Sequence, residues 1–204
     1  MGRIGARQFP WQRGFVSLSS LYRSAFIFGQ GECAAYLEEA ASLTVFDMTL
    51  VGFALMSVFH ADPAIRPATD LDLIHDFGID RGALTRTLAR IACPLVPARA
   101  NATAQRTGDV AAAYKPSVLR QFPCILVGPR SRSMMAPLPD LIMDRVTNGL
   151  FYDVVGGGGS VRDGIGKRFE TYTLDLLVHM LPTARFIPEV RYLSHSEGSR
   201  PLTF

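Results

Sequence analysis

Residues 156–192 read GGGGSVRDGIGKRFETYTLDLLVHMLPTARFIPEVRY, and the rest of the chain is interpreted around this stretch. The four consecutive glycines at its start are typical of a flexible connector. From Phe169 onward apolar residues recur at helical spacing, until Pro182 ends the pattern. Residues 186–192 then alternate between apolar and polar side chains, which predicts a half-buried strand. We therefore expect a flexible loop, a helix and a strand in this order.

The composition describes a globular chain with a mildly basic balance. Its 204 residues, 48% of them hydrophobic, suffice for one or two small domains with a core. A net charge of +3 is too small to indicate nucleic-acid binding by itself. The three cysteines are widely spaced and fit neither a disulfide framework nor a zinc site, which favours the cytoplasm. The most apolar segment, residues 48–59, is too short to span a bilayer, so we expect a buried helix there and no membrane partner.

Helical patterns dominate the first half of the chain. Residues 32–43 form one expected helix, and Asp47 or Thr49 can cap a second one that runs to Phe59. In the second helix we expect four residues to be buried: Leu50, Phe53, Ala54 and Met56.

Residues 70–92 predict two short helices joined by a turn. Gly78 is the expected end of the first helix, and Asp80 is the expected cap of a helix from Arg81 to about Ala92. This arrangement is similar to a helix-turn-helix, in which Arg86 and Arg90 would face DNA. Short helical hairpins are also common packing units, so both interpretations stay open.

The second half mixes a few strands and helices. Residues 94–116 are small and polar, which is typical of a linker. Residues 123–128 predict a strand that leads into a basic turn at 129–133, and residues 140–148 predict a helix. Residues 150–155 are either an extended segment, or they pack as a continuation of that helix up to the glycine loop.

Sequence motifs for nucleotide and hydrolase chemistry are absent. Gly166-Lys167 has Val161 where a Walker loop needs glycine, and Arg168 follows where Ser or Thr is required. No Gly-x-Ser-x-Gly elbow occurs. Carboxylates spaced four apart, such as Asp140 and Asp144, are typical of a solvated helix face. We therefore predict no metal site in this chain.

One family resemblance covers roughly residues 45–195. The chain resembles uncharacterised bacterial proteins in which a helical region precedes a restriction-endonuclease-like domain of the PD-(D/E)xK superfamily. The residues that carry the resemblance are Gly52–Leu55, Gly78–Asp80, Arg145–Tyr152, Gly166, Phe169, Glu170, Tyr172, Leu176, Leu177, Pro188–Val190 and Tyr192.

The resemblance implies a nuclease core of which only the opening is present. Glu170 matches the glutamate of the first helix in that superfamily, whereas the aspartate strand and the Glu-x-Lys strand have no counterpart. A complete member holds Mg²⁺ with these missing residues, because phosphodiester cleavage needs metal-activated water. We therefore expect no cofactor in this chain and no cleavage of DNA or RNA. Hydrolysis abolished by Glu170→Ala would contradict this expectation.

The sequence thus predicts an α+β, mostly α protein. A helical region, 1–115, is expected to precede the start of a nuclease-like domain, 116–204, with a flexible glycine-rich loop at 156–160. The resemblance implies a role in nucleic-acid processing or defence, with DNA bound by Arg162, Lys167 and Arg168. Two alternatives remain: a helical module that binds a partner protein, or a DNA-binding module that uses residues 70–92.

Overall fold

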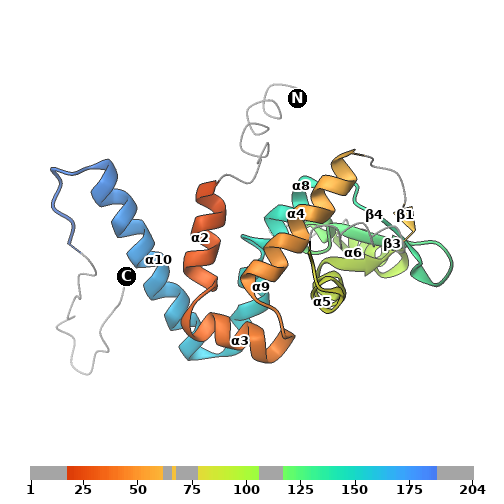
Figure 1. Cartoon of the computed structure of the whole chain (residues 1–204), viewed down its shortest axis with the longest axis horizontal. Helices are drawn as coiled ribbons and strands as arrows, with labels where there is room; N and C mark the ends of the chain where they lie inside the picture. The colour runs from red at the N-terminus through yellow and green to blue at the C-terminus, as the bar shows by residue number, and fades with distance from the viewer. Residues whose placement is uncertain (1–17, 62–65, 68–77, 106–116, 188–204) are drawn as a thin grey trace.

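The computed structural model describes residues 18–61, 66–67, 78–105 and 117–187. The fold is α+β and mostly α, as predicted. Figure 1 shows α10 at one end of the molecule and the small sheet with α6 at the other, with α2, α3, α4 and α9 between them. The elements are α2 (Leu18–Phe28), α3 (Gly31–Ala41), α4 (Val45–Ala61), β1 (Arg66–Pro67), α5 (Arg81–Ile91), β2 (Ala92–Pro94), α6 (Leu95–Gln105), α7 (Val118–Gln121), β3 (Cys124–Val127), η3 (Pro129–Ser131), β4 (Ser133–Met135), α8 (Asp140–Val146), α9 (Leu150–Val154), η4 (Val155–Gly157) and α10 (Gly159–Met180).

Helix α4 is the central element of the core. Its start is fixed by a reciprocal cap: the Thr44 hydroxyl accepts from the Asp47 amide at 3.0 Å, and the Asp47 carboxylate accepts from the Thr44 amide at 3.0 Å. Asp47 therefore acts inside the first turn of α4, and Thr44 is the cap that the sequence reading missed. The expected burial of Phe53 is wrong, because this side chain is 51% exposed while Met48, Leu55 and Phe59 point into the core.

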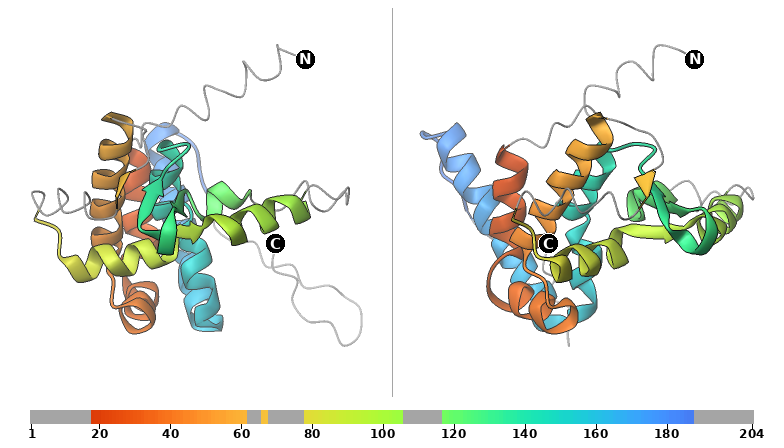
Figure 2. Two further views of the ribbon diagram at one scale, coloured as in Figure 1. Left: turned by 90° about the vertical axis from the view of Figure 1, so that its right-hand side faces the viewer. Right: turned by 45° about the vertical axis from the view of Figure 1, so that its right-hand side comes forward.

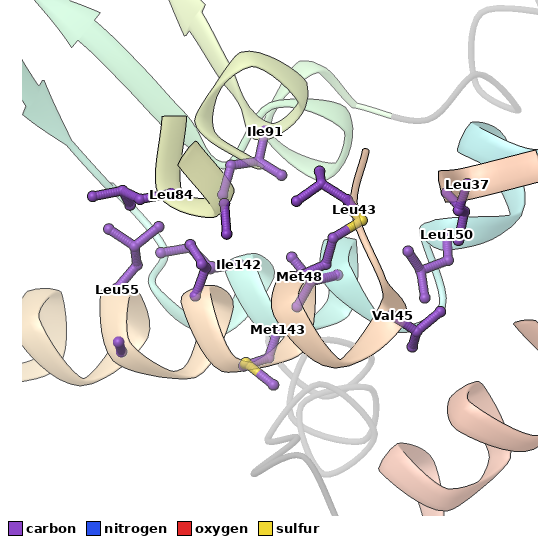
Figure 3. Close-up of a cluster of buried hydrophobic side chains, with 14 of the residues drawn as sticks. Leu37, Leu43, Val45, Met48, Leu55, Leu84, Ile91, Ile142, Met143 and Leu150 are labelled. Carbon is purple, nitrogen blue, oxygen red and sulfur yellow. The ribbon is translucent and has the colours of Figure 1, made fainter. Parts of the chain in front are cut away.

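Helices α5 and α8 cover the buried face of α4. Figure 3 shows Met48 and Leu55 of α4 facing Leu84 and Ile91 of α5 and Ile142 of α8. All of these side chains are less than a tenth exposed. The hydrophobic effect on this cluster holds the three helices together.

The predicted cap of α5 is confirmed. The Asp80 carboxylate accepts from the Ala83 amide at 2.9 Å, and α5 begins at Arg81. The partner helix expected at residues 70–77 lies outside the described residues, so the helix-turn-helix pairing stays a prediction.

The sheet is small and mixed, with strand order β1-β4-β3-β2. Strand β3 matches the strand predicted at 123–128. It forms an antiparallel hairpin with β4 and pairs in parallel with β2. A second cluster of buried side chains underlies it, formed by Cys93, Ala98, Val118 and Ile125.

Residues 150–155 are helical, which decides between the two alternatives that the sequence left open for them. They belong to α9 and the 3-10 turn η4, so the chain there is not extended. Helix α10 follows at once and begins at Gly159, about ten residues before the helical pattern became clear at Phe169. The predicted end before Pro182 is confirmed.

The strand expected at 186–192 is not seen where the structure can test it. Phe186 and Ile187 have no regular secondary structure, and residues 188–192 lie outside the described residues. Helix α10 makes its main contacts with α2, α3 and η4, and the sheet lies at the far end of the molecule (Figure 2).

The main core takes side chains from both sides of residue 115. Met48 and Leu55 pack in one buried cluster with Ile142, Leu150 and Val161. The helical region and the segment that follows it therefore share a hydrophobic core.

Candidate docking groove

An apolar groove opens between α2 and the start of α4, above the second half of α3. Its volume is ≈ 680 Å³. Aliphatic and aromatic side chains dominate its lining, together with small residues and one carboxylate. The residues that define it are Leu18, Tyr22, Ala25, Ala34, Glu38 and Phe46.

Helix α2 supplies one wall because it is apolar on two faces. Ser24, Ile27 and Phe28 point into the molecule and are buried. Leu18, Leu21, Tyr22, Ala25 and Gly29 recur at spacings of three and four, so they form a second stripe, which lines the groove. Leu18 at the end of this stripe is 85% exposed.

The turn between α3 and α4 sets the opposite wall. Ser42 adopts the left-handed conformation at φ 50° and its amide donates to the Glu38 carbonyl at 2.9 Å, which ends α3. The Thr44–Asp47 cap then starts α4, with Val45 turned inward and Phe46 turned outward. Phe46 is 72% exposed at the rim, where a large aromatic ring gains free energy if a partner covers it.

Small residues also line the groove. Ala25, Gly29 and Ala34 leave the backbone of α2 and α3 close to the surface. A Cβ added at Gly29 would lie 2.6 Å from the Ala25 carbonyl oxygen, so this position has no room for a side chain in its present conformation.

The charge beside the groove is acidic. Glu38 lines it, and α3 carries Glu32, Glu38 and Glu39 but no lysine or arginine. Among the described residues Glu38 and Glu39 are both exposed, and neither is in an ion pair shorter than 4.0 Å. A ligand with apolar side chains and one cation fits this lining.

Two of the arginines expected to bind nucleic acid, Arg90 and Arg168, make contacts within the protein. Arg168 donates to the Ile27 carbonyl at 2.9 Å, to the Glu32 carboxylate at 3.3 Å and to the Cys33 sulfur at 3.0 Å. These bonds tie α10 to the junction of α2 and α3. Arg90 donates to the Asp153 carboxylate at 3.1 Å and so links α5 to α9.

The other expected site residues are exposed and separate. Arg86 lies 3.8 Å from the Asp80 carboxylate, and the Arg162 Nε donates to the Val155 carbonyl at 3.1 Å. Lys167 and Glu170 are exposed on α10. The structure therefore brings Arg162, Lys167 and Glu170 onto one helix, while Arg86 lies on α5.

The titratable groups near α3 are structural. A hydrogen bond from its own backbone, followed by one from Arg168, lowers the pKa of the Glu32 carboxyl. Desolvation raises the pKa of the Cys33 thiol, and Arg168 opposes this only in part. Desolvation also raises the pKa of Cys124 to about 12. These thiols are protonated at neutral pH, which makes them poor nucleophiles.

The part of the chain that the structure describes holds no cluster of three or more His, Cys, Asp or Glu placed to bind a metal ion. In the same part no single helix has the length and apolar character to cross a membrane. Helices α3 and α4 meet these criteria only as a pair bent by 67°.

Sequence reasoning missed the groove. The signal that could have found it is the period of α2, in which Leu18, Tyr22, Ala25 and Gly29 continue a stripe that the buried face does not use. The glycines and Pro10 before residue 18 hid this pattern in the sequence.

Comparison with known proteins gives no relative to guide the assignment. No family model, no curated protein and no solved structure matches this chain.

Proposed function

We propose that this protein is a protein-interaction module whose α2–α4 groove binds an amphipathic helix. The observation that carries the proposal is the groove itself, an open apolar channel of ≈ 680 Å³ with exposed Leu18, Tyr22 and Phe46 along it. Grooves between helices recognise the apolar face of a partner helix, with anchors at i, i+4 and i+7. Burying the exposed side chains at the rim supplies the favourable free energy of binding, because each large apolar side chain removed from water contributes about 1.5–3 kcal/mol.

The acidic residue in the groove specifies the charge of the partner. A lysine or arginine beside the apolar face of the ligand can pair with Glu38, whereas a glutamate there would be repelled. The proposed ligand is therefore an apolar helical face flanked by a basic residue.

Two synthetic helical peptides test the proposal. They share one leucine stripe, and one peptide carries lysine beside the stripe where the other carries glutamate. Fluorescence anisotropy should show tighter binding of the lysine peptide, by about five-fold or more. No binding of either peptide would refute the proposal.

Matched variants locate the binding site. Phe46→Ser removes a groove residue, whereas Phe53→Ser removes an exposed phenylalanine of the same helix that does not line the groove. Glu38→Lys and Glu39→Lys form the second pair. Only Phe46→Ser and Glu38→Lys should weaken binding of the lysine peptide. Equal effects within each pair would place the binding elsewhere.

A short DNA duplex is the third probe, because the nuclease resemblance implies nucleic-acid binding. Phosphate contacts would give an affinity that falls steeply with salt. Salt-dependent DNA binding lost on Arg162→Ala would favour that role over peptide docking.

A further inference from the structure

We propose that the helix in the groove is α10 of a second copy of this chain, so that two copies exchange α10 across a two-fold axis. This inference rests on the proposed function of the groove. It adds the identity of the partner.

The second half of α10 exposes several large apolar side chains in the part of the chain that the structure describes. Of the 22 residues of α10, Val161 is the buried one, and Tyr172 contacts Tyr22 of α2 with ring centroids 6.3 Å apart. Beyond that point Leu176, Val178 and Met180 are 46%, 51% and 68% exposed. Several large apolar side chains exposed along one helix mark a candidate contact surface for a partner.

One stripe of α10 has the spacing of a helix that docks in a groove. Arg162, Phe169 and Leu176 are seven residues apart, and Met180 follows after four more, so all four lie along one flank. All four are exposed. This stripe combines apolar anchors with one basic residue, which is the ligand chemistry that the groove requires.

The apolar part of the stripe, from Phe169 to Met180, and the groove have the same length. Leu18 to Gly29 and Phe169 to Met180 each span about 16 Å at the rise of an α-helix. Glu38 lies at the Gly29 end of the groove, because α3 follows α2 there. A second copy of α10 with its N-terminal half at that end brings Arg162 near Glu38 and the apolar anchors against Tyr22 and Leu18.

This orientation is compatible with two-fold symmetry. Within one chain α10 runs antiparallel to α2, since Arg168 contacts Ile27 while Tyr172 stacks near Tyr22 with ring centroids 6.3 Å apart. The second copy of α10 would also run antiparallel to α2, on its other side. The two α10 helices are then parallel to the axis, and α2 and α10 of both copies alternate as a four-helix bundle.

The exposed apolar surface is large enough for such an interface. Leu18, Tyr22, Phe46, Phe169, Leu176 and Met180 are between 46% and 85% exposed. Side chains of this size offer on the order of 600–800 Å² together, near the ~800 Å² that each partner contributes to a standard interface.

Sedimentation of the full chain over a range of concentrations tests the inference. The parent protein should be a dimer. Phe46→Lys in the groove and Leu176→Lys on the stripe should each raise the dissociation constant of the dimer by about 30-fold or more. Val178→Lys places the same charge on the opposite flank of α10, and Phe53→Lys places it on α4 two turns beyond Phe46, outside the groove lining. Both variants should leave the dimer intact.

Mixing the two dimer-breaking variants provides a stricter test. A Phe46→Lys chain keeps its stripe and a Leu176→Lys chain keeps its groove, so the mixture retains one intact contact of the two and should form a heterodimer. Two α10 helices pairing with each other would leave the Phe46→Lys protein dimeric, which would overturn the inference.

A monomer at all concentrations would also overturn the inference, and the peptide assay separates the two proposals. A monomer that binds the lysine peptide retains the docking function with another partner. A monomer that binds neither peptide would refute both proposals.

Discussion

Asp153 joins more elements than any other acidic residue described above. Its carboxylate accepts from Arg145 at 2.7 and 2.9 Å and from Arg90 at 3.1 Å. Arg145 is 4% exposed, and it also donates to the carbonyls of Gln121 and Gly149. These bonds connect α5, α7, α8 and α9 through a single ion cluster, in which the bidentate geometry satisfies the buried guanidinium.

We expect Asp153→Asn to destabilise the protein by about 3–5 kcal/mol, because it leaves the buried charge of Arg145 without a counter-charge. Urea unfolding followed by circular dichroism measures the change. Asp144→Asn is the matched control, since its carboxylate accepts at the surface from Asn148. The control should cost less than about 0.5 kcal/mol. Equal losses for the two variants would show that the cluster is not a stabilising centre.

At the scale of the elements, the contact between α4 and α8 depends on a glycine. A Cβ at Gly52 would lie 2.5 Å from a methyl group of Val146, so the two helices approach too closely for any side chain at this position. Gly166 in α10 is the opposite case, because a Cβ there meets nothing within 4 Å. Both glycines lie inside helices, where alanine is intrinsically preferred.

Gly52→Ala should therefore destabilise the protein by about 1–3 kcal/mol through overpacking. The higher helix propensity of alanine offsets up to about 1 kcal/mol of this cost. Gly166→Ala should stabilise it by about 0.5–1 kcal/mol. Thermal unfolding of both variants measures the signs. Combining Gly52→Ala with Val146→Ala should cost less than the sum of the single changes, because the second substitution removes the clash. If the destabilisation of the double variant equals the sum of the two single changes, the strain does not come from the contact between residues 52 and 146.

At the scale of the whole molecule, one core spans the boundary that the sequence suggested at residue 115. Helix α4 packs on α8, and the cluster continues into α9 and the start of α10. Neither side of the boundary buries its apolar face alone. A helix that loses its covering partner exposes that face to water.

We expect the described parts of the chain to unfold in one cooperative transition. Hydrogen exchange measured by mass spectrometry in increasing urea should show α4 and α8 opening together. A fragment of residues 1–115 and a fragment of residues 116–204 should each lack cooperative unfolding. Two separate transitions, or a folded fragment, would support the two-domain division at residue 115.

The sequence by itself determined the elements whose signals are local. Apolar spacing and the cap at Asp80 located α5, the run at 123–128 located β3, and Pro182 marked the end of α10. Caps and periodicity act within one or two turns, so they can be read without knowing the neighbours. The same spacing could not say that Phe53 would be half exposed, because burial depends on which face a neighbouring helix covers.

Only the tertiary structure decided which charged side chains are paired within the protein and where apolar side chains form a groove. Arg90 and Arg168 look like surface cations in the sequence, but their partners Asp153 and Ile27 are 63 and 141 residues away. The groove forms because α2 and the start of α4 diverge above α3, which no local pattern encodes. Long-range contacts bring distant residues together, and they gave this chain its ion cluster, its shared core and its candidate docking site.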